Sequence, residues 1–455
     1  MTRSWSQAGV QRALVAAARA GAVAHAAFLP LSIAGMQIGL VVSAVALLAI
    51  AWTRGRAWAH GLLDAPVLLF CAAAVLSIGI AWAAGSPPVG WFGATLWRSF
   101  LAPLVLLSAI AVEAPGERGD ASRRAILVLC TWAVAAVATA AIAWYQYRSG
   151  ADVLYEMGLR RAPFHPPLPP RDTARFAANG LFKGYTVFAQ NLSPPLLLAA
   201  ALALFAPLPR RQRLLLGIAA ALATFTVALT FSRIAWAALV VAGLVLLVLG
   251  DRRRAGRAIA VLAAVLVAAT LVAPDLHRRL ARAVSPEAFA DRRMIWGVCA
   301  AVVRDHPVFG VGWGNLHPRV HAYYDRLAPD AGVQAGCHDV FYTLYAEGGL
   351  LLVVAGVAYW ALLLRGLWRA RRRAAPASLA SAAAAGGFAG TLALLLNGLF
   401  HDVFYSSEPM YGLGFALAIA AALSEPRAAS IDGEASTSAR DRRARGARAG
   451  RSGPA

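Results

Sequence analysis

Residues 345–373 read YAEGGLLLVVAGVAYWALLLRGLWRARRR, an apolar stretch that ends in a cluster of five arginines. No residue between Leu350 and Leu364 is charged. A helix that crosses a membrane needs about 20 mostly apolar residues, and basic residues gather in the cytoplasmic loops beside such helices. The stretch therefore predicts a transmembrane helix at 345–365, with its C-terminal end in the cytoplasm.

The composition of the whole chain agrees with a membrane protein. Of the 455 residues, 59% are hydrophobic and 14% are charged, whereas soluble globular chains have about 45–50% and about 25%. These proportions exclude a soluble enzyme, a disordered chain and a coiled coil. The formal net charge of +21 is attributed to arginine-rich cytoplasmic loops rather than to nucleic-acid binding. We expect an all-α polytopic integral membrane protein.

Similar apolar stretches recur along the chain and predict about twelve transmembrane helices. The first is the weakest, because it contains Arg19 and His25. The approximate limits are 13–33, 37–53, 60–82, 97–113, 125–147, 184–206, 212–230, 233–250, 258–274, 345–365, 377–397 and 408–424.

The distribution of basic residues predicts the orientation of these helices. With the N-terminus in the cytoplasm, 26 basic residues fall in inward segments, whereas the four short outward loops hold only Arg98 and Arg233. This asymmetry follows the positive-inside rule and predicts an even number of spans with both termini cytoplasmic.

The expected organisation has four parts. Residues 1–274 hold spans 1–9, with an outward loop at 148–183. Residues 275–344 form a large outward loop before the tenth span. Residues 345–424 hold spans 10–12. The tail, 425–455, is basic and rich in small residues, and we expect it to be disordered in the cytoplasm.

The large outward loop carries three motifs in order. They run from Arg292 to Trp296, from His306 to Asn315 (HPVFGVGWGN), and from His338 to Leu350 (HDVFYTLYAEGGL). The glycines of the second motif lack the βαβ unit of a dinucleotide site, so we interpret it as a close turn that packs the loop on the membrane domain. The pentapeptide HDVFY at 338–342 recurs at 401–405, which we interpret as convergence or chance rather than duplication.

Together these motifs resemble the O-antigen ligase/O-antigen polymerase family, and most of all its ligase branch. Family members usually have Asn where this chain has Asp339. The resemblance implies an inverting, metal-independent glycosyltransferase without a cofactor. Its donor would be a glycan on undecaprenyl pyrophosphate and its acceptor lipid A–core, at the periplasmic face of a bacterial inner membrane. The loop 275–344 would then be periplasmic.

The resemblance also implies site residues. The family's catalytic histidine falls on His338, its span-edge arginine on Arg233 and its loop arginine on Arg292, with Arg293 as an alternative. The chemistry agrees, because arginine presents a forked, permanently charged set of donors to phosphate. Arg98 is a further pyrophosphate-binding candidate, since charged residues at span edges are often functional, although Arg98 and Arg233 can also simply snorkel to the interface.

His338 is the candidate general base, because neutral imidazole accepts a proton near neutral pH. If a helix includes His338, then Phe341, Tyr342 and Tyr345 share its face and line an aromatic site. Asp339 can orient His338 only if the helix begins there. Glu347 lies on the opposite side of that helix, and we interpret it as structural.

Metal binding is not expected, because no outward Asp-x-Asp and no His/Cys cluster has ligand spacing. Whether Cys299 and Cys337 pair stays open, since a disulfide there requires an oxidising compartment. Three rival functions also stay open: an O-antigen polymerase, a protein O-oligosaccharyltransferase, and a transporter, although no half-to-half symmetry is visible. The expected partners are the lipid-linked donor, the lipid A–core acceptor and membrane lipids, without nucleic acid.

Overall fold

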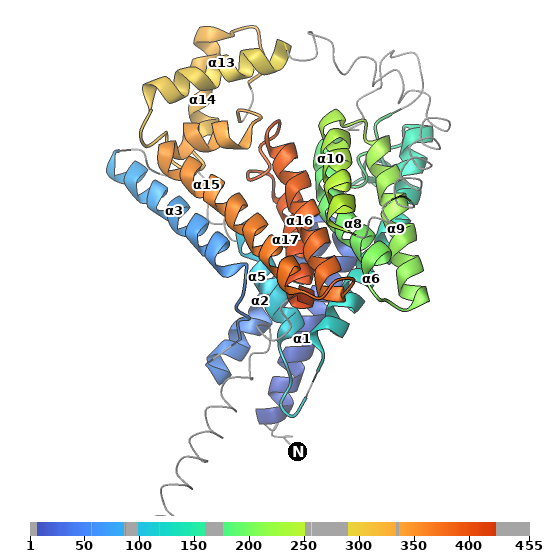
Figure 1. Ribbon diagram of the computed structural model, residues 1–455. Coiled ribbons are helices and arrows are strands. Elements are labelled where there is room, and N and C mark those ends of the chain that lie inside the picture. Colours follow the sequence, from blue (N-terminus) through green and yellow to red (C-terminus); the bar gives the residue numbers. More distant parts are fainter. Residues whose placement is uncertain are drawn as a thin grey trace, which may run out of the picture.

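The computed structural model describes residues 7–55, 57–85, 87, 99–117, 119–159, 176–250, 256, 290–333 and 336–424. The regular elements within these residues are α-helices (Figure 1). They are α1 (Gln7–Phe28), α2 (Ile33–Arg54), α3 (Asp64–Ala83), α5 (Ala102–Ala111), α6 (Ala121–Ser149), α7 (Val153–Glu156), α8 (Tyr185–Phe205), α9 (Arg210–Leu229), α10 (Arg233–Leu249), α13 (Ala290–Asp305), α14 (Leu316–Leu327), α15 (Val340–Arg373), α16 (Leu379–Gly398) and α17 (Ser407–Ser424).

Seven of the described helices are long and apolar enough to cross a membrane, namely α2, α3, α6, α8, α9, α15 and α16. Helices α5 and α10 are apolar but shorter. Helix α17 coincides with the last expected span, whereas α1 overlaps the first but begins and ends several residues before it. The all-α class is therefore confirmed for the described residues, and these helices are consistent with a polytopic membrane protein. The expected span 258–274 and the tail 425–455 lie outside the described residues, so the number twelve stays a prediction.

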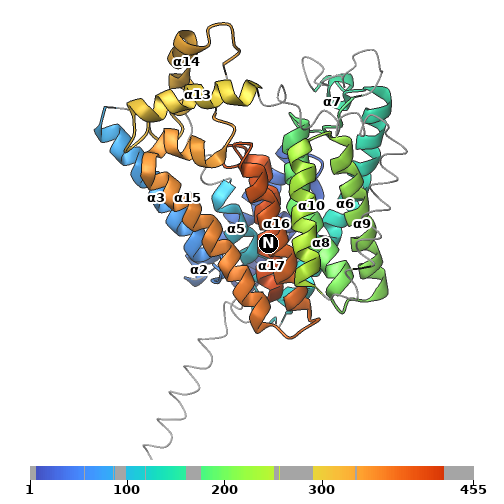
Figure 2. The same ribbon diagram turned by 45° about the horizontal axis from the view of Figure 1, so that its top comes forward.

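Helices α16 and α17 lie in the centre of the bundle, between α3 and α15 on one side and α6, α8, α9 and α10 on the other (Figures 1 and 2). Every residue of α17 from Pro409 to Leu423 is buried. Small residues allow the close approach: a Cβ at Gly412 would lie 2.2 Å from the carbonyl oxygen of Asn191 on α8. Such small-residue contacts are typical of helix packing in membranes.

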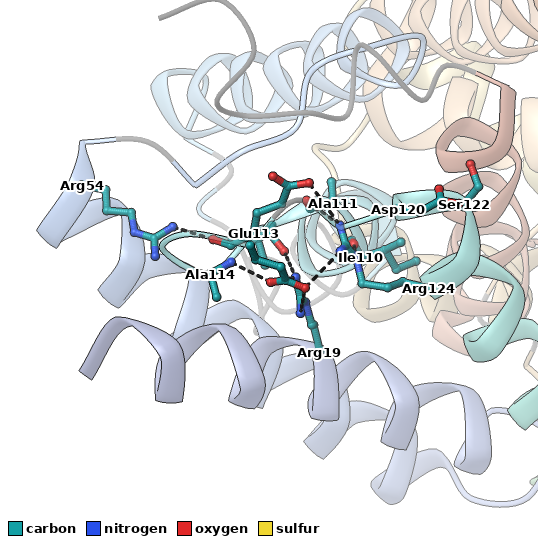
Figure 3. A network of polar contacts seen from close by, with 11 residues as sticks. Arg19, Arg54, Ile110, Ala111, Glu113, Ala114, Asp120, Ser122 and Arg124 are labelled. Atoms are coloured by element: carbon teal, nitrogen blue, oxygen red, sulfur yellow. Dashed lines mark hydrogen bonds and ion pairs between the residues drawn. The ribbon is translucent and has the colours of Figure 1, made fainter. Parts of the chain in front are cut away.

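Arginines from α1, α2 and α6 bind the C-terminal end of α5 and the turn that follows it (Figure 3). Arg19 donates to both carboxylate oxygens of Glu117, at 2.9 and 2.8 Å. Arg124 donates to the carbonyls of Ile110 and Ala111 at 2.6 and 3.1 Å, Arg19 to that of Val112 at 2.6 Å, and Arg54 to that of Glu113 at 2.8 Å. The ion pair with Glu117 thus offsets the cost of placing the charge of Arg19 in the first expected span. The three arginines also satisfy carbonyl groups at the C-terminus of α5 that have no partner within the helix.

The loop between α10 and α15 contains a small helical unit of α13 and α14, which lies beyond one end of the bundle (Figure 1). Its core has Ile295, Val298 and Val302 from α13 packed near Leu316, Val320 and Tyr324 from α14. Cys299 and Cys337, whose pairing the sequence left open, form a disulfide with Cα atoms 6.0 Å apart. The described part of the expected outward loop is therefore a folded unit tied to the start of α15.

Candidate functional site

His338 lies at the junction where the loop ends and α15 begins. Its φ is 53°, in the left-handed region that non-glycine residues rarely adopt and that is common at functional sites. Its backbone N–H donates to Oδ2 of Asp402 at 2.9 Å. The side chain is 30% exposed, so the backbone of this residue is held in place while its ring can be reached from outside.

The carboxylate of Asp402 organises this junction from the second copy of HDVFY. Besides the N–H of His338, it accepts a hydrogen bond from the hydroxyl of Thr343, which in turn accepts one from the N–H of Cys337 at 3.0 Å. Nδ1 of His338 lies 3.8 Å from Oδ2 of Asp402, beyond hydrogen-bond range. Catalytic contacts are often this long before substrate binds.

The second imidazole of the repeat, His401, lies with its ring centre 6.1 Å from that of His338. The two copies of HDVFY therefore meet at one place, although they are far apart in sequence.

The charge states follow from burial. Burial raises the pKa of Asp402 to about 6, against the opposing hydrogen bonds from Thr343 and His338. Burial, and then the positive charge of Arg292, lower the pKa of His338 to about 4. The same two causes, with His338 itself, lower the pKa of His401 to about 3. At neutral pH the site thus holds two neutral imidazoles beside an ionised carboxylate.

Asp339 caps α15 instead of orienting His338. Its Oδ1 accepts hydrogen bonds from the N–H groups of Phe341 and Tyr342, both at 2.9 Å. Because α15 begins at Val340, His338 lies outside the helix, and the expectation that it shares a helix face with three aromatic residues is wrong. The hydroxyl of Tyr342 donates to the carbonyl of Trp296 at 3.2 Å, so this ring binds α13.

Of the two adjacent loop arginines, Arg292 is the one that contacts the histidine segment. Its Nη1 donates to the carbonyl oxygen of His338 at 3.4 Å, and Arg292 is half-buried, whereas Arg293 is exposed. The geometry thus favours Arg292 over the alternative that the sequence left open.

Arg233 is the first residue of α10. The guanidinium of Arg371, near the end of α15, donates to the carbonyl of Leu249, the last residue of α10. The C-terminal ends of these two helices therefore lie together, and the opposite ends, with Arg233 and His338, face the same side of the bundle. Arg98 lies outside the described residues.

The glycine-rich motif packs the loop onto α15, as expected. The N–H of Val311 donates to the carbonyl of Ala346 at 3.0 Å, and that of Gly312 to the carbonyl of Glu347 at 2.6 Å. The buried carboxylate of Glu347 accepts hydrogen bonds from the N–H groups of Gly314 and Leu316, at 2.8 and 3.3 Å. Glu347 is thus structural, as interpreted, and it ties the motif and the start of α14 to α15.

Trp313, in the middle of the same motif, connects this packing to the candidate site. Its buried ring stacks on that of Tyr405, with centres 5.0 Å apart. Tyr405 is the last residue of the second HDVFY copy, so the loop, the start of α15 and the turn before α17 form one packed unit.

Asp402 and Thr343 were missed as site residues. The repeated pentapeptide was the signal for Asp402, because it placed a second His-Asp pair near the end of another span. Thr343 carries no such signal, since a threonine inside a helix is common. Within the described residues, no three His, Cys, Asp or Glu side chains are grouped as a metal ion would need.

The comparison with protein families agrees with the motifs. The family model described as O-antigen ligase matches residues 218–357, a segment that contains Arg233, Arg292, Arg293 and His338. The match confirms the resemblance to this family and does not separate its branches. No curated protein matches the chain significantly.

Proposed function

We propose that this protein, whose residues 218–357 match the O-antigen ligase family, is a glycosyltransferase of the ligase type. In this proposal it moves a glycan from undecaprenyl pyrophosphate to a sugar hydroxyl of lipid A–core. The reaction takes place at the periplasmic face of the inner membrane. The family match supports glycan transfer in general, and the donor, the acceptor and the face come from the resemblance of the motifs.

The observation that carries the proposal is the environment of His338. A neutral imidazole, with a pKa of about 4, stands beside the carboxylate of Asp402. An arginine from the loop binds the carbonyl of the same histidine. A neutral imidazole offers the acceptor nitrogen that a general base needs, and an anionic leaving group needs fixed cations. This junction brings both within one site.

In the proposed reaction the acceptor hydroxyl oxygen attacks the anomeric carbon of the donor glycan. A ring nitrogen of His338 takes the hydroxyl proton as the new C–O bond forms, and Asp402 stabilises the resulting imidazolium. The bond between the anomeric carbon and the phosphate oxygen breaks, and its electron pair leaves with the undecaprenyl pyrophosphate. Attack from the side opposite the leaving group inverts the anomeric configuration.

Arginine side chains stabilise the departing pyrophosphate in this proposal. Arg292 approaches from the loop and Arg233 from the start of α10, while Arg98 and Arg293 are further candidates. Guanidinium groups hold phosphate oxygens through paired hydrogen bonds, so no divalent cation is required. Purified protein should accordingly keep its activity in excess EDTA, and a loss restored by magnesium would contradict this part of the mechanism.

The experiment that tests the function uses His338→Asn in a deletion strain. Asparagine tolerates a positive φ better than alanine does, so the backbone is preserved while the base is lost. We expect normal insertion, loss of the lipopolysaccharide ladder and retained lipid-linked polymer. Transfer by the purified variant should fall at least about 10²-fold.

A matched control is His317→Asn, which changes an exposed histidine on α14 and should leave the ladder intact. A normal ladder in His338→Asn would contradict the assignment of the base. In the deletion strain itself, a single-repeat band would indicate a polymerase. An unchanged ladder with loss of glycoprotein would indicate transfer to protein.

A further inference from the structure

The disulfide between Cys299 and Cys337 joins the two parts of the loop that meet at the candidate site. Cys299 lies on α13, seven residues after Arg292, and Cys337 directly precedes His338. Both cysteines are buried, and 38 positions separate them in the sequence. One covalent bond therefore connects the helix that carries the arginine to the segment that carries the histidine.

Arg292 and Cys299 lie on the same face of α13. Seven residues of an α-helix make about two turns, or about 10.5 Å along the axis. Ile295 and Val302 on this side of the helix are buried, so the face packs inward along its length. The disulfide at Cys299 and the hydrogen bond from Arg292 to the carbonyl of His338 are two attachments of one rigid helix to one segment.

Cys337 is in turn bound to the bundle. Its N–H donates to Thr343 at 3.0 Å, and Thr343 donates to Asp402, the carboxylate that also binds the N–H of His338. The disulfide thus connects α13 to the same carboxylate that positions the histidine. Reduction breaks the S–S bond to two thiols with two electrons from a dithiol or phosphine, and α13 then loses its covalent link to this network.

We propose that the Cys299–Cys337 disulfide is a positioning element of the transfer site, which holds Arg292 in place beside His338. Binding of the donor pyrophosphate then requires the oxidised protein. Such a bond forms and persists in an oxidising compartment, so the site becomes complete only after the loop has left the cytoplasm. This inference rests on the proposed function, because it assigns the donor pyrophosphate to Arg292.

The test uses the full chain in lipid nanodiscs, oxidised as isolated or reduced with a phosphine, with thiols counted by mass spectrometry. Reduction should raise the KM for the lipid-linked donor and lower kcat/KM at least about tenfold. The variant Cys299→Ser/Cys337→Ser should have the same low value and should not respond to the phosphine. The control Cys71→Ser/Cys130→Ser changes the two free cysteines and should behave like the wild type.

Arg292→Ala separates positioning from general stabilisation. If the disulfide acts through Arg292, reduction should change kcat/KM of this variant by less than about twofold, because the interaction is already lost. If reduction lowers transfer by Arg292→Ala and by the wild type by the same factor, the disulfide only stabilises the loop and the inference is wrong. Free thiols at Cys299 and Cys337 in protein isolated from its membrane would overturn it as well.

Binding of undecaprenyl pyrophosphate alone, measured in parallel, distinguishes failure of this inference from failure of the proposed function. Binding that weakens on reduction, without any glycan transfer, would contradict the transferase and support the positioning role. Transfer by the oxidised protein with binding that reduction does not change would contradict the positioning role and leave the transferase intact.

Discussion

At the scale of single residues, the backbone of His338 shows how the site is held together. A non-glycine residue in the left-handed region costs about 1–2 kcal/mol, and His338 has a φ of 53°. A hydrogen bond to a charged group contributes about 1.5–3 kcal/mol, and the N–H of His338 makes one to Asp402. The two magnitudes are comparable, so the hydrogen bond to Asp402 offsets the cost of the left-handed conformation. Asp402 thereby determines where the imidazole lies.

Asp402→Asn should therefore impair transfer without removing the imidazole. Asn keeps one acceptor oxygen, and its amide nitrogen cannot accept a hydrogen bond. The pattern in which Asp402 accepts from both His338 and Thr343 is therefore lost together with the charge. We expect kcat/KM to fall roughly 10- to 100-fold. Asp325→Asn, an exposed position on α14, is the matched control. Normal transfer by Asp402→Asn would show that this carboxylate has no part in catalysis.

Arg233 tests whether the geometry of the guanidinium matters. Arg233→Ala should reduce transfer about 10²-fold by removing charge stabilisation of the departing pyrophosphate. Arg233→Lys should restore little, because a point charge does not reproduce the fork. Steady-state kinetics of the two variants give the answer. Full activity of the lysine variant would show that the fork is unimportant, and full activity of the alanine variant would leave snorkelling as the role of Arg233.

The pH dependence of transfer follows from the shifted pKa values of His338 and Asp402. In the proposed mechanism, transfer needs His338 neutral and Asp402 ionised. The pKa of Asp402 is raised to about 6, so it takes up a proton first as the pH falls. The pKa of His338 is lowered to about 4, so the imidazole is still neutral at that point. A plot of kcat/KM against pH should therefore fall below about pH 6.

The same profile should move in Arg292→Ala. The positive charge of Arg292 lowers the pKa of both groups, so its removal should shift the acid limb to higher pH. A profile that stays flat between about pH 5 and pH 8 would contradict the assigned charge states.

At the scale of elements, α15 is two helical segments joined at a kink rather than one straight span. Gly349 has φ 59° and ψ −153°, a conformation that is essentially restricted to glycine. A Cβ there would lie 1.9 Å from the carbonyl oxygen of Val308. The kink is therefore where the glycine-rich motif closes on α15, and it directs the first segment of the helix toward the candidate site.

Gly349→Ala should disrupt the contact between the glycine-rich motif and α15. The unfavourable backbone conformation alone costs about 1–3 kcal/mol, and the clash with Val308 adds to it. We expect a lower midpoint of thermal unfolding and weaker transfer. Gly297→Ala on α13 is the control, because its Cβ would meet open space and alanine favours a helix by about 0.5–1 kcal/mol. Equal midpoints of thermal unfolding for Gly349→Ala and Gly297→Ala would show that the kink does not require glycine.

At the scale of the whole molecule, the arginines have more than one role. Arg54 and Arg124 belong to the basic residues that predict the orientation, and the structure also uses them to bind the carbonyls at the end of α5. Arg371, at the end of α15, binds the end of α10. Basic residues of the predicted inward side thus also hold helix ends together there, opposite the end where His338 lies.

The orientation is tested with reporter fusions. A reporter placed after residue 320, on α14, should report the periplasm, and one placed at the C-terminus should report the cytoplasm. The expectation follows from the asymmetry between 26 inward basic residues and two in the short outward loops. If both reporters indicate the same compartment, the twelve-span plan is wrong.

The sequence by itself determined the class of the protein and the residues of its loop motifs. Apolar stretches of about 20 residues predict membrane-spanning helices from composition alone. The order of the motifs indicated His338 and the adjacent pair of Arg292 and Arg293. These features are local, since each depends on residues close together along the chain. They could be recognised without knowing how any helix packs.

Only the tertiary structure decided which groups surround His338. Asp402 lies 64 positions away in the sequence, and its contact with His338 depends on the kink at Gly349 and on the lengths of α15 and α16. The pairing of Cys299 with Cys337 likewise depends on how α13 lies against the start of α15. Hydrogen bonds and disulfides act over a few ångströms, so the geometry of intervening helices, rather than residue type, determines whether such partners meet.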